Sequence, residues 1–197
     1  MNFLAHAKLG GTNEEIVAGS VIGEYIKGPN LSHLPKDIET GVRLHRAIDS
    51  HVDQHSFYFK VVNSLDQKSK RYARIVLDVY CDHLLIMHWA NFSDISFNQF
   101  TTHTNHLINK YIDLVPERYS IVLNKLIREN WLASYKDITG IEMALSRIEY
   151  RLGRNLNLCQ MLQQIMQLDQ EMVATHFKAF YHDVTLFATQ FVNQNNS

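Results

Sequence analysis

The strongest constraint on the fold is a helical repeat of apolar residues that is interrupted by polar side chains. Between residues 38 and 52 the repeat consists of Ile38, Val42, His45, Asp49 and Val52. Residues four apart lie one above the other on an α-helix, so His45 and Asp49 should face the interior with their apolar neighbours. An ion in a protein interior must be paired or coordinated, because desolvating it costs several kcal/mol. The segment therefore predicts a helix with a buried polar site.

Two further segments show the same pattern. Asp78 and Asp82 are four residues apart in an apolar stretch that continues with His83, and Glu24 extends the stripe of Val17 and Val21. A single histidine and aspartate one turn apart is more often a structural hydrogen bond than a metal site. Three such features on three predicted helices instead favour one shared metal site.

The composition predicts an all-α protein. The 197 residues include only 3 prolines and 8 glycines, with 46% hydrophobic and 20% charged residues, which suits long helices. We expect one domain over residues 1–197 with a frayed tail at 193–197. Apolar spacing and cap residues predict helices at about 12–27, 35–55, 57–65, 70–89, 96–115, 117–129, 139–152 and 156–191, the last as one helix or two.

Charge and hydropathy exclude several functional classes. The net charge of −1 provides no basic field for nucleic acid. No segment approaches ~20 uncharged apolar residues, and the N-terminus does not resemble an export signal. We therefore expect neither a membrane span nor export. Cys81 and Cys159 are predicted to be reduced thiols of a cytoplasmic protein.

The residue types indicate the chemistry. Imidazole and carboxylate ligands favour Mn²⁺, Fe²⁺ or Mg²⁺ over a thiolate-bound structural zinc. The chain lacks the Glu-x-x-His pairs of di-iron bundles, which favours hydrolysis over redox chemistry. We expect the ligands to come from His45, Asp49, Asp78, Asp82 and His83. Adjacent helical residues point about 100° apart, so we expect one of Asp82 and His83 to support the site without binding the ion.

Three other side chains are candidates for catalysis. Arg46 is predicted to reach a substrate phosphate, and Glu24 to face the metal. His6 is either a ligand or general acid, or a structural histidine near the N-terminus. A bound ion would lower the pKa of a water molecule and neutralise charge on phosphoryl oxygens.

Four motifs carry a resemblance to a known family. They are Asn2-Phe3-Leu4-Ala5-His6, Gly41-Val42-Arg43-Leu44-His45-Arg46-Ala47-Ile48-Asp49, Leu77-Asp78-Val79-Tyr80-Cys81-Asp82-His83 with His88-Trp89, and Trp131-Leu132-Ala133-Ser134-Tyr135. In this combination and order the chain resembles the bacterial acyl carrier protein phosphodiesterases, also called acyl carrier protein hydrolases. The family pattern has an aspartate at the position of Glu24, which keeps the charge but places the carboxylate one methylene closer to the backbone.

The resemblance implies a fold and a reaction. The fold would be a distorted relative of the metal-dependent HD phosphohydrolases, helical throughout, with Mn²⁺ or Mg²⁺ as cofactor. The reaction would be hydrolysis of the phosphodiester between 4′-phosphopantetheine and a serine of holo acyl carrier protein. Two alternatives remain open: a phosphohydrolase of nucleotides or other small phosphoesters, and a non-enzymatic helical binding module whose inward charges are structural ion pairs.

A basic segment precedes the predicted helix around Asp78. It contains Lys68, Lys70, Arg71 and Arg74. Such a run is commonly a solvated face. Because acyl carrier proteins are strongly acidic, the resemblance gives this segment a second interpretation as a docking surface beside the site.

Overall fold

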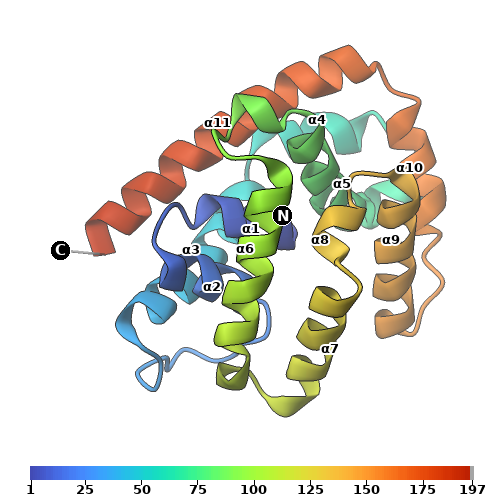
Figure 1. Cartoon of the computed structure of the whole chain (residues 1–197). Coiled ribbons are helices and arrows are strands. Elements are labelled where there is room, and N and C mark those ends of the chain that lie inside the picture. The colour runs from blue at the N-terminus through green and yellow to red at the C-terminus, as the bar shows by residue number, and fades with distance from the viewer. Residues whose placement is uncertain (196–197) are drawn as a thin grey trace.

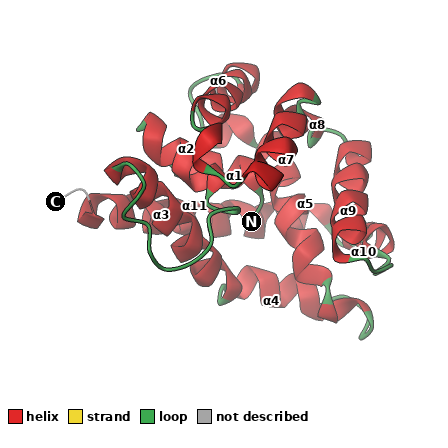
Figure 2. Ribbon diagram, turned by 90° about the horizontal axis from the view of Figure 1, so that it is seen from below, coloured by secondary structure: helices red, strands yellow, loops and turns green. Residues whose placement is uncertain are grey.

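The computed structural model describes residues 1–195, and in this range every regular element is helical (Figures 1 and 2). The α-helices are α1 (Phe3–Leu9), α2 (Glu14–Ile22), α3 (Lys36–Asp53), α4 (Ser56–Asn63), α5 (Ala73–Met87), α6 (Phe97–Lys110), α7 (Glu117–Arg128), α8 (Trp131–Ser134), α9 (Ile138–Leu152), α10 (Leu158–Met166) and α11 (Gln170–Asn195). Three short 3₁₀ helices are η1 (Ser69–Arg71), η2 (Trp89–Asn91) and η3 (Ile112–Leu114). The all-α prediction is confirmed.

Local sequence signals explain most helix boundaries. The Asn13 side chain accepts hydrogen bonds from the backbone N–H groups of Glu15 and Ile16 and so caps α2. Ser96 and Gln99 form a capping box at the start of α6. Pro35 and Pro116 stand directly before α3 and α7, where a proline disfavours helical backbone in the preceding residue and fixes the entry of the chain.

Several predicted bounds need correction. The first predicted helix ends at Ile22 rather than near residue 27, which places Glu24 in the following turn. The predicted helix 156–191 is two helices, α10 and α11. Residues 193–195, expected to fray, belong to α11, while 196 and 197 lie outside the described residues. The sequence analysis did not predict α1 or α8.

A close helix contact joins α2 and α3 through two glycines. A Cβ added to Gly19 would lie 2.3 Å from the Ile38 carbonyl oxygen, and one added to Gly41 would lie 2.3 Å from that of Ile16. Only a hydrogen at both positions allows the backbones to approach this far. One turn further along α3, this approach brings the His45 ring against the backbone of α2.

The buried side chains form one hydrophobic cluster that includes residues from Met1 to Ala188. α1 and the N-terminus lie near the middle of the molecule, with α2 and α3 on one side and α7, α8 and α9 on the other (Figures 1 and 2). α11 extends along one side of the molecule (Figure 1) and packs against α3. Among the described helices, none is both long and apolar enough to cross a bilayer.

Candidate metal centre

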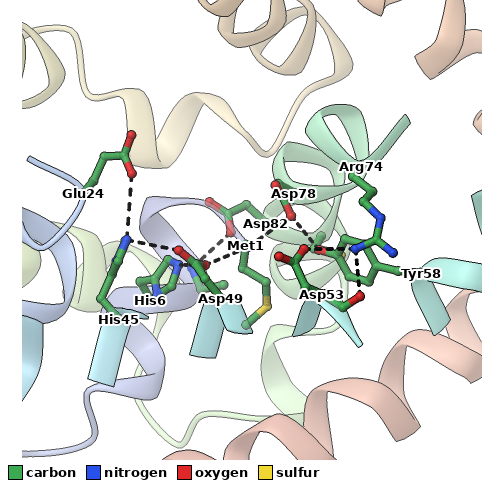
Figure 3. A network of polar contacts seen from close by, with 12 residues as sticks. Met1, His6, Glu24, His45, Asp49, Asp53, Tyr58, Arg74, Asp78 and Asp82 are labelled. Atoms are coloured by element: carbon green, nitrogen blue, oxygen red, sulfur yellow. Dashed lines mark hydrogen bonds and ion pairs between the residues drawn. The ribbon is translucent and has the colours of Figure 1, made fainter. Parts of the chain in front are cut away.

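Two histidines and an aspartate from α1 and α3 meet in one cluster. The rings of His6 and His45 stack with centroids 3.9 Å apart, and the cluster is completed by Asp49 (Figure 3). Asp49 Oδ1 lies 3.1 Å from His6 Nε2, and Asp49 Oδ2 lies 3.4 Å from His45 Nε2. One ligand atom from each residue fits within a 4.8 Å group. The predicted pair of His45 and Asp49 is therefore joined by His6, at a spacing compatible with one metal ion.

The His45 ring is oriented by the backbone of α2. Its Nδ1 lies 2.8 Å from the Ser20 carbonyl oxygen, and because a carbonyl can only accept, Nδ1 carries the hydrogen. In the neutral ring the lone pair of Nε2 then faces Asp49 Oδ2 and also Glu24 Oε2, 3.8 Å away. A lone pair facing two carboxylates repels them unless a cation lies between. This donor set fits a divalent ion, and a hydrogen bond from Nδ1 to a carbonyl is the usual support of a metal-binding histidine.

Burial keeps the two imidazoles neutral. Both rings are buried, and desolvation lowers the pKa of His6 and His45 below the ordinary value of 6.5. For Asp49, burial alone would raise the pKa, but the hydrogen bond with His6 and the positive charge of the Met1 amino group lower it below its ordinary value. The cluster therefore presents two neutral imidazoles and one carboxylate at neutral pH, which are the protonation states that bind a metal.

Asp78 lies next to the cluster but not in it. Its Oδ1 accepts a hydrogen bond from the Tyr58 hydroxyl at 2.8 Å and lies 3.1 Å from the Met1 α-amino nitrogen. The same amino group is 3.6 Å from Asp49 Oδ1. Burial lowers the pKa of this amino group, but the two carboxylates outweigh burial and raise it to about 11. A protonated amine thus separates Asp78 from the cluster.

Two further residues expected among the ligands, besides Asp78, lie outside the cluster. Asp82 is fully buried, and its oxygens accept hydrogen bonds from the backbone N–H groups of Leu4 at 2.9 Å and Ala5 at 3.0 Å. It caps α1, whose own N-cap residue makes no side-chain cap bond. Burial outweighs these bonds and raises the pKa of Asp82 to about 7. His83 points elsewhere, with Nδ1 donating to the Tyr135 carbonyl at 2.9 Å.

Arg46, which is expected to reach a substrate phosphate, is directed away from the cluster. Its Nη2 donates to the Ile26 carbonyl at 2.8 Å, and the side chain does not line the cavity beside the cluster. The reason is helical geometry: Arg46 follows His45 directly and therefore projects about 100° away from it.

The basic segment lies at the margin of the site. Lys68 and Arg71 are exposed and Lys70 is partly exposed, whereas Arg74 Nη1 donates to the carbonyl of Asp53 at 2.8 Å and to its carboxylate at 3.0 Å. Asp53 lines the cavity, but the four cations do not. Figure 3 shows Arg74 beside Asp53, on the Asp78 side of the site.

A cavity of about 700 Å³ opens onto the cluster. One wall carries the polar groups of the turn after α2, of α3 and of α5, including Glu24, Asp49 and Asp78. α7 and α9 also line the cavity, and α9 contributes Arg147 and Arg151. The sequence analysis did not select these two arginines. The available signal was their spacing of four residues, which places both on one face of the predicted helix 139–152.

Metal-free protein should lose stability as the pH falls below about 6.5. The unfolded chain binds protons at the ordinary histidine pKa of 6.5, whereas folded His6 and His45 have lowered pKa values, so acid favours unfolding. The free energy of unfolding should fall by up to about 1.4 kcal/mol per pH unit for each imidazole. Asp82 offsets part of this fall, because its raised pKa makes the folded state take up a proton below about pH 7. Urea denaturation in EDTA from about pH 5 to about pH 7.5 measures this slope.

Two variants test whether His45 causes this pH dependence of the free energy of unfolding. His45→Asn should flatten it, and His106→Asn, at an exposed position of α6, should not. An unchanged slope in His45→Asn would show that this ring is not held neutral by burial.

The site is thus a candidate divalent-metal centre in an all-α protein. The family model for acyl carrier protein phosphodiesterases matches residues 1–184, and the chain belongs to this family. Acyl carrier protein phosphodiesterase of Escherichia coli O6:H1 (strain CFT073) is 30% identical over 155 residues, covering 78% of this chain and 80% of that protein. The protein of the same name from Escherichia coli O139:H28 (strain E24377A) is 29% identical over the same length. No solved structure matches the chain, and the likeness to the HD fold stays a prediction.

Proposed function

We propose that this chain hydrolyses the phosphodiester that joins 4′-phosphopantetheine to a serine of holo acyl carrier protein, and that it does so with a divalent metal ion. The observation that carries the proposal is the cluster of His6, His45 and Asp49 at the cavity. Membership of the family supplies the substrate. The alternative of purely structural ion pairs does not account for a neutral His45 whose Nε2 faces two carboxylates.

The proposed ligands are His6 Nε2, His45 Nε2 and a carboxylate oxygen of Asp49, with Mn²⁺ as the expected ion and Mg²⁺ or Fe²⁺ as alternatives. Glu24 and Asp78 offer further oxygens, since their side chains are 37% and 40% exposed and line the cavity. When bound, such an ion supplies a water of lowered pKa and neutralises charge on the phosphoryl oxygens. Asp82 contributes indirectly, because it holds the first turn of α1 and thereby positions His6.

In the proposed reaction the oxygen of a water molecule attacks phosphorus, and the bond between phosphorus and the serine oxygen breaks. The Glu24 carboxylate, at the open side of the cluster, accepts the proton of the attacking water. The serine oxygen leaves with a proton from solvent. The products are apo acyl carrier protein and 4′-phosphopantetheine, so the step consumes one water molecule and no other reactant.

Mass spectrometry of purified holo acyl carrier protein tests this function. Incubation with the enzyme and Mn²⁺ should convert the holo form to the apo form, and excess EDTA should prevent the conversion. A panel of nucleotides and small phosphodiesters under the same conditions tests the alternative substrate class. Turnover of the small esters without turnover of the holo protein would overturn the proposal, as would holo turnover that persists in EDTA.

We also propose that the basic segment steers the acidic substrate. Changing Lys70→Glu together with Arg71→Glu should lower kcat/KM on holo acyl carrier protein about tenfold at low salt and flatten its salt dependence. Arg74 is spared because it holds Asp53. Hydrolysis of a small phosphodiester should be unchanged.

A control with the same net charge change is Lys36→Glu with Lys178→Glu, at exposed positions of α3 and α11. It should leave the salt dependence of kcat/KM nearly unchanged. Loss of small-ester hydrolysis in the Lys70 and Arg71 variant would instead place the segment in the catalytic machinery.

A further inference from the structure

Two arginines of α9 line the cavity that contains the metal-ligand cluster. Arg147 and Arg151 are four residues apart, so they lie on one face of the helix, and His6, His45 and Asp49 line the same cavity. Glu24 and Asp78 add two more carboxylates to the lining. These carboxylates repel a substrate anion, so an anion bound in the cavity needs positive charge from the proposed metal ion and from α9.

Arg151 is separated from the cluster by a single carboxylate. Its Nη1 lies 3.8 Å from Glu24 Oε1, and the other oxygen of Glu24 lies 3.8 Å from His45 Nε2. The Arg151 side chain is 58% exposed and lines the cavity, so its remaining donors are accessible to a ligand. Because the contact to Glu24 is long and single, the guanidinium is available to a stronger, forked acceptor such as a phosphate.

Arg147 is held more firmly. Its Cζ lies 4.1 Å from the centroid of the Trp131 ring, and its Nη2 lies 3.3 Å from Glu129 Oε2. Its Nη1 is buried and has no hydrogen-bond partner among the described residues. A buried donor without an acceptor costs free energy. Stacking therefore fixes a planar cation in the cavity wall, and one of its donors lacks an acceptor among the described residues.

The α7 and α9 lining beside the arginines is mostly apolar, with Lys125 of α7 as one further cation. Val122 of α7 and Ala144 and Ile148 of α9 line the same cavity. Such a surface suits a long uncharged arm better than a second charged group, and thus suits a phosphate that carries a flexible organic chain.

We propose that Arg151 and Arg147 bind the non-bridging oxygens of the substrate phosphate, and that the adjoining α7 and α9 surface holds the pantetheine arm. The inference rests on the proposed function and deepens it, because it assigns the phosphate to α9 rather than to Arg46. The two arginines are substrate-binding residues that orient the phosphorus toward the cluster.

Calorimetric titration of 4′-phosphopantetheine into the Mn²⁺-loaded protein tests the assignment. Arg151→Ala should weaken binding at least about tenfold, since it removes charge-assisted hydrogen bonds. Arg151→Lys should restore part of the affinity, because a lysine keeps the charge but loses the fork. Arg154→Ala is the matched control: this arginine is exposed, lies two residues after the end of α9 and does not line the cavity. It should bind like the unchanged protein.

A second measurement separates ligand binding from structure. Mn²⁺ affinity of Arg151→Ala should be unchanged or higher, because removing a cation beside an acidic wall does not weaken cation binding. Arg147→Gln removes the charge and retains a polar side chain, and it should also weaken 4′-phosphopantetheine binding. The thermal midpoint of this variant shows whether it is folded. Parallel loss of Mn²⁺ and 4′-phosphopantetheine binding would overturn the assignment in favour of a structural role.

Binding of holo and apo acyl carrier protein shows whether the arginines contact the phosphate or the carrier protein itself. If the arginines bind the phosphate, their variants should weaken binding of the holo form and leave the apo form unaffected. Equal weakening of both forms would overturn the assignment and make α9 a protein-docking surface. If the arginine variants weaken 4′-phosphopantetheine binding but the unchanged protein does not hydrolyse holo acyl carrier protein, only the proposed function is refuted. If the unchanged protein hydrolyses holo acyl carrier protein but Arg151→Ala binds 4′-phosphopantetheine as tightly, only the arginine assignment is refuted.

Discussion

Replacing His45 by alanine should lower the rate of holo acyl carrier protein hydrolysis at least about a hundredfold and remove high-affinity Mn²⁺ binding. His45 supplies the nitrogen that faces both Asp49 and Glu24, and its ring stacks on the only other imidazole of the cluster, His6. Its removal leaves one imidazole and one carboxylate. Steady-state turnover by mass spectrometry and calorimetric Mn²⁺ titration measure the two effects.

The comparison with Asp49→Ala tests whether the residues act as a unit. Each single variant should be strongly impaired, and the double variant should be scarcely worse than either, because groups that serve one site are non-additive when removed. His106→Ala, at an exposed position of α6, should retain full activity. Near-normal turnover by His45→Ala would show that the cluster is not the catalytic centre.

Replacing Asp82 by alanine should lower the free energy of unfolding of the metal-free protein by about 2–5 kcal/mol. The change removes the acceptor of two buried N–H groups, and each unsatisfied group costs about 1–3 kcal/mol. The measurement is urea denaturation in EDTA at about pH 6, below the raised pKa of this carboxyl group, so that the cost of burying an ionised carboxylate does not offset the loss of the two hydrogen bonds. Asp82→Asn should lose less, because it keeps one acceptor oxygen.

The control for Asp82 is Asp113→Ala on η3, at an exposed position, which should change stability by less than about 0.5 kcal/mol. The two roles considered for Asp82 give opposite results. A capping role predicts a large loss of metal-free stability. A role as direct ligand predicts weakened Mn²⁺ binding with metal-free stability unchanged.

Local spacing predicts which residues of the candidate site lie close together on one helix. His45 and Asp49 are one turn apart on α3, so their proximity follows from helix geometry alone. The capping residues Asn13 and Ser96 likewise fix the starts of α2 and α6 from nearby sequence. Both kinds of feature depend on residues within a few positions of each other.

The parts that were missed depend on contacts between distant segments. α1 is buried on nearly all sides, including Leu4, Ala5 and Ala7, so it has no polar face that would produce a helical stripe. Its cap comes from Asp82, 78 positions away along the chain from Leu4, and spacing within one helix does not reveal such a partner. Asp82 has the same residue type and helical period as a metal ligand, and only the position of the α1 backbone distinguishes the two roles.

The arginines of α9 were missed for the same reason. In the sequence they belong to a charged helix end typical of a solvated face. Tertiary packing places this end at the cavity that α3 also lines. Arg46, in contrast, lies beside the predicted ligand His45 in the sequence but is directed away from it by the helical twist.

Crystals of the protein grown with Mn²⁺ and measured near the manganese absorption edge test whether His6, His45 and Asp49 bind the metal ion. An anomalous difference map locates the ion without reference to activity. We expect a peak within bonding distance of His6 Nε2, His45 Nε2 and a carboxylate oxygen of Asp49. A peak at Asp82 and His83, or the absence of any peak at the cluster in Mn²⁺-saturated crystals, would contradict it.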